Sequence, residues 1–109
     1  MAYSESLARR VRSILGVRAG IVEKKMFGGV GFLHRGNMAV GIWRESLIAR
    51  LGADGATAAR QLPHVVDFDI TGRPMKGWVM VLSEGIDDDR DLADWIAKTL
   101  EFVETLPSK

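Results

Sequence analysis

The sequence contains no cysteine, and it has only two histidines and three prolines among its 109 residues. Without cysteine, the chain has no disulfides, no thiolate nucleophile and no thiolate metal ligands. No stretch approaches the roughly 20 consecutive apolar residues that a membrane-spanning helix needs. The start of the chain, residues 1–5, is followed by a charged amphipathic stretch and does not resemble a secretory signal. We therefore expect a cytoplasmic protein that does not enter the membrane.

What the sequence does contain is typical of a globular protein. Apolar residues make up 47% of the chain and charged residues 27%. A chain of this length usually forms one core, so we expect a single domain over residues 1–109.

The net charge is only +1, but the charges are unevenly distributed. Residues 1–50 carry nine basic and three acidic side chains, whereas residues 51–109 carry six basic and eleven acidic ones. This asymmetry indicates either a basic surface for nucleic acid or complementary faces for self-association. Alternatively, the two sets interleave once the chain folds.

Two amphipathic helices are predicted near the ends of the chain. Ser4 can cap a first helix that runs to about Leu15 and stops at Gly16. A longer helix is expected from about Asp88 to Leu106, and the acidic residues at its start, Asp87, Asp88, Asp89 and Asp91, can cap its free amides. Its apolar stripe is widened by Trp95, Phe102 and Leu106. Such a stripe usually covers a sheet, and its flank is a candidate contact with a second subunit in a homodimer.

Between the two helices the apolar residues alternate as they do in strands. Strands are expected at 21–27, 30–34, 38–43, 46–51, 65–70 and 78–82, the first two being either separate or one bent ribbon. Short links make the pairing antiparallel. A short helix, capped by Asp54 and ended by Pro63, separates the fourth strand from the fifth. The predicted fold class is therefore α+β: two layers, with one antiparallel sheet and helices mainly on one of its faces.

Two details of the third strand can also be predicted. In the turn Arg35-Gly36-Asn37, Gly36 and Asn37 are the residues suited to positive φ. After this turn, Met38 and Val40 are expected to point to the same face of the sheet.

The motifs that resemble catalytic or metal sites are incomplete. Gly28-Gly29-Val30-Gly31 lacks the strand-to-helix context of a dinucleotide loop, and glycines in a strand more often mark a bulge. His34 and His64 do not have zinc-type spacing. We therefore predict no catalytic residue, no metal site and no cofactor.

The loop before the last strand is more informative. It places Arg73, Lys76 and Trp78 close together in the sequence. An arginine can bind a carboxylate or phosphate with two hydrogen bonds, and an indole offers a stacking surface. This group is a candidate site for an anionic ligand, a peptide carboxylate or a nucleic-acid backbone. In the structural alternative, Arg73 pairs with Asp67 or Asp69, Lys76 is solvated and Trp78 belongs to the core.

Several segments resemble the N-terminal domain of the TfoX family. They are Lys25 to Phe32, Gly36-Asn37-Met38, Gly41, Arg50-Leu51-Gly52, Phe68-Asp69, Thr71 to Val79 and Leu106-Pro107. The resemblance implies a two-layer α/β fold like that of secretion chaperones, in the order α-β(3)-α-β(2)-α. Full-length members promote expression of competence genes alongside a cyclic-AMP receptor protein and carry a separate C-terminal domain. No catalytic residue is associated with the family's motif.

The leading hypothesis is a non-enzymatic interaction module, accessory to transcriptional or competence regulation, which binds a protein partner or forms a homodimer. One alternative is nucleic-acid binding through the basic first half with Arg73 and Lys76. The other is a small anionic-ligand site or an undiscovered enzyme. The candidate binding residues are Arg73, Lys76, Trp78, Lys25 and Arg50.

Overall fold

The computed structural model describes residues 3–16, 20–26, 28–68 and 76–108. Within these ranges the elements follow one another as α1 (Glu5–Leu15), β1 (Ile21–Met26), β2 (Gly29–His34), β3 (Asn37–Trp43), β4 (Ser46–Arg50), α2 (Gly52–Ala59), β5 (Val65–Asp67), β6 (Trp78–Val81), a short 3₁₀ turn (Ser83–Gly85) and α3 (Asp89–Val103). Four strands therefore precede α2, where the family resemblance implied three. No helix in the described part of the chain is long and apolar enough to cross a membrane.

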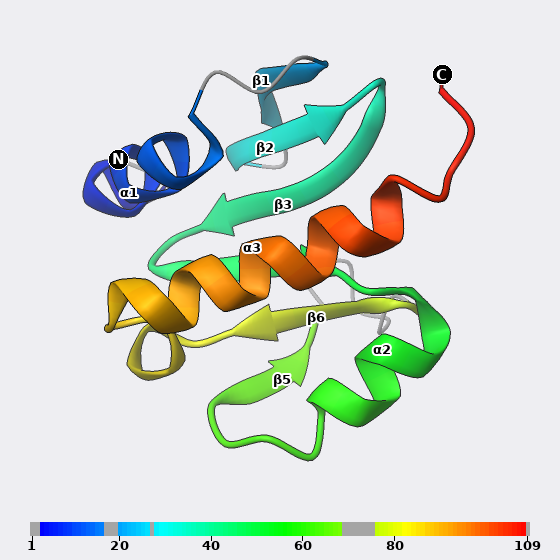
Figure 1. Cartoon of the computed structure of the whole chain (residues 1–109). Helices are drawn as coiled ribbons and strands as arrows, with labels where there is room; N and C mark the ends of the chain where they lie inside the picture. The colour runs from blue at the N-terminus through cyan, green and yellow to red at the C-terminus, as the bar shows by residue number, and fades with distance from the viewer. Residues whose placement is uncertain (1–2, 17–19, 27, 69–75, 109) are drawn as a thin grey trace.

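The described strands form one antiparallel sheet in the order β1-β2-β3-β4-β6-β5. The predicted α+β class is confirmed, and the first two strands are separate partners joined at Gly28. Figure 1 shows α3 lying across one face of the sheet. Helix α1 lies beside the half of the sheet that contains the first strands, and α2 lies near β5 and β6. The helices pack on one face because each must bury its apolar stripe.

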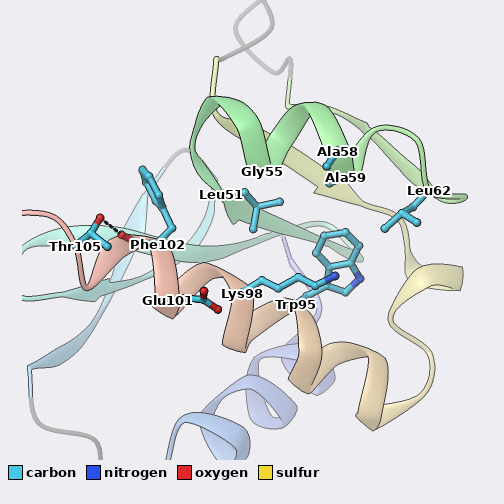
Figure 2. A pocket seen from close by; sticks show the side chains of 10 residues that line it. All are labelled: Leu51, Gly55, Ala58, Ala59, Leu62, Trp95, Lys98, Glu101, Phe102 and Thr105. Carbon is cyan, nitrogen blue, oxygen red and sulfur yellow. Dashed lines mark hydrogen bonds between the residues drawn. The ribbon is translucent and has the colours of Figure 1, made fainter.

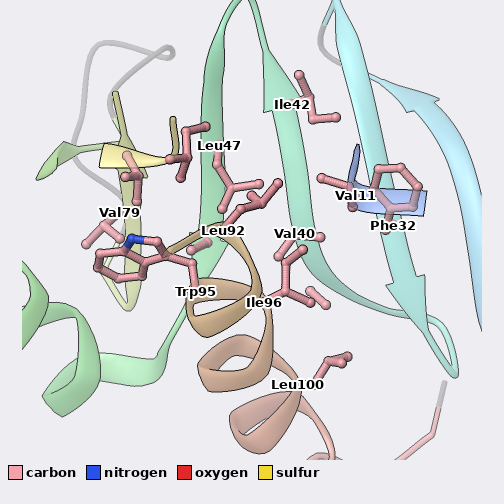
Figure 3. Close-up of a cluster of buried hydrophobic side chains, with 14 of the residues drawn as sticks. Val11, Phe32, Val40, Ile42, Leu47, Val79, Leu92, Trp95, Ile96 and Leu100 are labelled. Carbon is pink, nitrogen blue, oxygen red and sulfur yellow. The ribbon is translucent and has the colours of Figure 1, made fainter. Parts of the chain in front are cut away.

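The core lies between α3 and this face of the sheet. Leu92, Ile96 and Val103 of α3 are buried. They pack against a cluster that includes Val40, Ile42, Leu47 and Val79 from the middle strands. Figure 3 shows Leu92 and Ile96 directed toward the strands, with Trp95 at one flank of the cluster. The broad stripe of α3 is therefore used mainly to cover the sheet.

The first helix begins and ends as predicted. The Ser4 hydroxyl accepts a hydrogen bond from the Leu7 amide at 3.1 Å, and Gly16 follows Leu15 with a φ of +62°. Polar contacts join this helix to the start of α3. Arg10 donates to a carboxylate oxygen of Asp89 at 2.8 Å and to the Ile86 carbonyl at 2.6 Å.

The turn between β2 and β3 differs from the prediction at one residue. Positive φ angles occur at Arg35 (+50°) and Gly36 (+86°), whereas Asn37 already belongs to β3. Asn37 is buried, and its side-chain amide donates to the Pro107 carbonyl at 2.8 Å. The asparagine therefore ties the end of the chain to the sheet and does not serve as a turn residue.

A β-bulge in β3 interrupts the alternation of its side chains between the two faces of the sheet. Leu33 pairs with Met38, but its neighbour Phe32 pairs with Val40, so that Ala39 is the extra residue. Ala39 and Val40 both belong to the buried core, while Met38 is only half-buried. The prediction that Met38 and Val40 share a face is wrong, because the extra residue shifts the alternation.

The short helix α2 begins earlier than predicted. Its first residue is Gly52, its N-cap is Leu51 and no side chain caps it, so Asp54 lies in the first turn and is not the cap. The helix ends at Ala59, before the predicted end. The last helix begins at its predicted cap, where Asp88 accepts from the Arg90 amide at 2.8 Å, and ends at Val103. Among the described residues of the predicted fifth strand, pairing covers Val65–Asp67, and the predicted residues 69 and 70 lie outside that description.

Removing a core side chain of α3 should destabilise the fold. Leu92 is 0% exposed. We expect Leu92→Ala to lower the free energy of unfolding by about 2–5 kcal/mol, because it leaves a cavity between α3 and the sheet. Urea unfolding followed by circular dichroism measures this loss. The matched control Leu62→Ala removes the same atoms from a side chain that is 45% exposed, and it should cost less than about 1 kcal/mol. Equal losses in the two variants would contradict the described packing.

An ion pair between α1 and β1 should make stability depend on pH. Arg12 donates to both carboxylate oxygens of Glu23, at 2.7 and 2.6 Å. This hydrogen bonding holds the pKa of Glu23 below its ordinary value of 4.5. A lowered carboxyl pKa stabilises the fold above that ordinary value, and the contribution disappears as the pH falls through the lowered pKa.

The variant Arg12→Ala should therefore be less stable than wild type at pH 7, by less than about 1 kcal/mol because solvent screens the partly exposed pair. The difference should shrink toward zero in acid. Urea unfolding at a series of pH values tests this, with Glu23→Gln as the partner variant. A difference that is unchanged in acid would show that the Arg12 side chain acts through packing alone.

Candidate functional site

Two segments that are distant in sequence meet at the end of β4. The carbonyl of Gly77 accepts hydrogen bonds from the Leu51 and Gly52 amides, at 2.9 and 3.1 Å. Arg50 and Trp78 are register partners of β4 and β6. The junction thus joins Arg50-Leu51-Gly52 to Lys76-Gly77-Trp78. It also provides a partner for two amides at the start of α2, those of the N-cap residue Leu51 and of Gly52, which have no partner within the helix.

Glycine is required at both sides of this junction. Gly52 and Gly77 have φ angles of +79° and +86°, which side chains of L residues rarely tolerate. A Cβ on Gly77 would lie 3.4 Å from the backbone of Gly52. A Cβ on Gly52 would lie 2.6 Å from a ring carbon of Phe102, so that this ring rests directly on the glycine. The backbone junction therefore also positions an aromatic side chain of α3.

A small cavity, which we call the Arg50 pocket, opens at the junction. It has a volume of about 240 Å³ and is lined by Arg50, Gly52, Ala53, Lys76, Gly77, Trp78 and Phe102. Among the described residues that line it, the two charged ones, Arg50 and Lys76, are both cations. Its backbone floor comes from the two glycines, and its walls come from the two aromatic rings.

Arg50 is held between these two rings. Its guanidinium carbon lies 5.3 Å from the centroid of the Trp78 ring and 6.0 Å from that of Phe102. Trp78 in turn packs against buried Phe68, with ring centroids 5.9 Å apart. Cation–π contacts of this kind attract the guanidinium to the ring faces and restrict its orientation. The half-buried arginine is therefore held by cation–π contacts with two rings.

A larger cavity, the α2–α3 groove, lies between the two helices. Its volume is about 620 Å³ and its lining is mostly apolar. One wall is formed by Leu51, Gly55, Ala58, Ala59 and Leu62, and the other by Trp95, Lys98, Glu101, Phe102 and Thr105. Figure 2 shows Leu51 between Phe102 at one end of the groove and Trp95 with Leu62 at the other. Phe102 also lines the Arg50 pocket, so the two cavities adjoin at this ring.

The structure brings together three of the five residues proposed from sequence. Arg50, exposed Lys76 and half-buried Trp78 line one pocket. Arg73 lies outside the described residues. Lys25 is exposed on β1. In the sheet order, β1 is separated from β4, the strand of Arg50, by three strand spacings of about 4.8 Å each. The positive charge of Lys25 acts there to lower the pKa of Glu23, after the larger effect of Arg12.

The residues of the groove were not among the candidate binding residues predicted from sequence. Trp95 and Phe102 were predicted to widen the apolar stripe of α3, whose flank was a candidate contact with a second subunit. The width of the stripe was the signal in the sequence that could have indicated the groove. If a stripe is broader than is needed to cover the sheet, its flank is left to face another element. Here the flank faces α2, where Ala58 and Gly55 are small enough to leave space.

The acidic residues of β5 have a structural partner. Arg60 donates to a carboxylate oxygen of Asp67 at 2.6 Å, so that the cation paired with Asp67 comes from the end of α2. Among the described residues, no group of three or more histidine or carboxylate side chains is arranged to hold a metal ion.

Adding a methyl group at Gly52 should disturb both the backbone and the Phe102 ring. Gly28 offers a matched control, because its φ of +77° is nearly the same and a Cβ there meets no atom within 4 Å. We expect Gly28→Ala to lower the free energy of unfolding by about 1–2 kcal/mol through backbone strain alone. Gly52→Ala should cost at least about 1 kcal/mol more, because the ring must move.

Urea unfolding measures both losses, and proton NMR shifts of the Phe102 ring report its displacement. Only Gly52→Ala should move these resonances. Equal stabilities and unshifted ring resonances would be inconsistent with the close contact.

Comparison with known proteins gives one match. The sequence pattern of the TfoX N-terminal domain matches residues 14–103. No curated protein and no solved structure shows a significant match. The matched range includes β4, α2, β6 and all of α3, and with them the described lining residues of both cavities except Thr105. The chain therefore belongs to the TfoX N-terminal domain family.

Proposed function

We propose that this chain is a non-enzymatic interaction module, accessory to transcriptional or competence regulation, which binds a segment of a partner protein in the α2–α3 groove. The carrying observation is the groove itself. Its volume of about 620 Å³ falls within the roughly 300–1,000 Å³ that is usual for binding sites. Membership of the TfoX N-terminal domain family supports the regulatory role. A cytoplasmic location stays a prediction.

The chemistry of the groove favours apolar side chains of a protein partner. Trp95 and Phe102 supply the large rings that are common at the energetic centres of protein interfaces. Lys98 lies with its amino group 4.9 Å from the centroid of the Trp95 ring, and Glu101 adds a carboxylate to the lining. An apolar floor with a charged rim is typical of grooves that accept an amphipathic segment.

A charged side chain in the groove should abolish this binding. Ala58 is exposed and lines the groove, whereas Ala97 is exposed on α3 and lines neither cavity. Peptides selected by display on the wild-type protein should bind Ala97→Glu with unchanged Kd. They should bind Ala58→Glu at least about tenfold more weakly, because the carboxylate would be desolvated in an apolar site. Isothermal titration calorimetry measures each Kd. A selection that yields no peptide, or peptides that bind both variants equally, would refute the proposed groove function.

A second copy of the chain is the alternative occupant, in keeping with the predicted homodimer. Leu62 is 45% exposed at the groove and is available for such a contact. Light scattering distinguishes the two occupants. If the wild-type protein is a dimer and the Ala58→Glu variant is a monomer, the second subunit occupies the groove.

Nucleic-acid binding is less well supported by the arrangement of charges. Arg10 and Arg12 of the basic half are engaged by Asp89 and Glu23. Exposed Lys24 and Lys25 remain on β1. If these lysines bind a phosphate backbone, electrophoretic shifts should show a complex at low salt that weakens steeply as salt is added. A Lys24→Gln, Lys25→Gln double variant should then lose the complex.

A further inference from the structure

Arg50 has hydrogen-bonding capacity that the described part of the protein does not use. Its guanidinium carbon makes cation–π contacts at 5.3 Å from the centroid of the Trp78 ring and 6.0 Å from that of Phe102. A guanidinium carries five N–H donors in its plane. Within the described residues the side chain of Arg50 forms neither a hydrogen bond nor an ion pair. Arg10, Arg12 and Arg60, by contrast, each donate to a carboxylate.

The surroundings of this arginine favour an anion. Lys76 is the other charged residue of the Arg50 pocket, and no carboxylate lines it among the described residues. Because Gly52 and Gly77 lack side chains, their backbone leaves the floor of the pocket clear. The volume of about 240 Å³ is below the roughly 300 Å³ at which ligand pockets usually begin. The pocket therefore suits the end of a side chain better than a whole drug-sized ligand.

The position of Phe102 connects this pocket to the groove. Its ring lines both cavities, so a peptide lying along α3 in the groove meets the Arg50 pocket at one end. Arg50, Lys76 and Lys98 outnumber the one acidic residue, Glu101, among the described lining residues of the two cavities. This charge balance complements an acidic segment and opposes a basic one. A nucleic acid matches less well, because the adjoining groove is mostly apolar.

We propose that the Arg50 pocket binds the carboxylate of an acidic side chain in the partner segment whose apolar residues occupy the α2–α3 groove. This inference rests on the function proposed above and specifies the chemistry of the partner. Arg50 supplies a fork of N–H donors oriented by the two rings, which suits the two oxygens of a carboxylate. Lys76 adds a second positive charge at the exposed side.

The test uses peptides selected on the full chain and confirmed to need the groove by their loss on Ala58→Glu. They should contain an aspartate or glutamate at a fixed distance from their apolar residues. Replacing that glutamate by glutamine, or aspartate by asparagine, should raise the Kd for wild type about tenfold, since one charge-assisted pair is lost. Calorimetry at low and high salt should show that the acidic peptide alone is salt-sensitive.

Variants of the protein, each measured with the acidic and the amide peptide, complete a double-mutant cycle. Arg50→Gln should bind the acidic peptide more weakly and lose most of the preference for the acidic peptide over the amide peptide. Because Arg50 also packs between two rings, thermal unfolding checks that this variant is folded. Lys76→Gln changes an exposed residue and should reduce the preference for the acid without altering stability. Arg9→Gln removes an exposed cation of α1 and is the control that should leave Kd unchanged.

The outcomes separate this inference from the proposed function. Peptides that need the groove but bind equally well as acid and amide overturn the inference alone. The same holds if both Arg50→Gln and Lys76→Gln retain the full preference for the acid. A selection that yields no groove-dependent peptide overturns the proposed function and this inference together.

Discussion

The carbonyl of Gly77 accepts hydrogen bonds from two amides at the start of α2. The arrangement of the candidate site depends on this junction between the end of β4 and the start of β6. It provides a partner for the amides of Leu51 and Gly52, and it fixes where the helix leaves β4. From this starting point α2 runs beside α3, which creates the groove, and Arg50 is left beside Trp78 at the end of the sheet. A backbone contact between two glycines thus determines the positions of side chains that carry charge and aromatic surface.

Four of the described arginines fall into two groups when their partners are compared. Arg10, Arg12 and Arg60 connect elements of the fold through carboxylates. Arg50 is oriented by aromatic rings instead, and this arrangement leaves its donors available. The charge asymmetry seen along the sequence is partly cancelled in space, since Arg10 from the basic half meets Asp89 from the acidic half. Net charge along the chain therefore says less about binding than the partner of each arginine does.

Features governed by neighbours in sequence were predictable, whereas features governed by distant contacts were not. The caps at Ser4 and Asp88 were foreseen because each acts on an amide within three residues. The start of α2 was missed because its amides bond to a carbonyl 25 residues downstream. Lys76 and Trp78 were grouped by proximity in sequence, and Arg50 joins them only through the pairing of β4 with β6. The groove required the packing of α2 beside α3, which no local pattern specifies.

The shared position of Phe102 makes the two cavities energetically dependent on each other. Its ring rests on Gly52 and has little room to move toward the backbone. Any occupant that shifts the ring from one cavity changes the space in the other. By thermodynamic linkage, the effect of the first occupant on the affinity of the second equals the reverse effect. A two-part ligand would therefore experience the groove and the pocket as one cooperative site, with an aromatic ring as the coupling element.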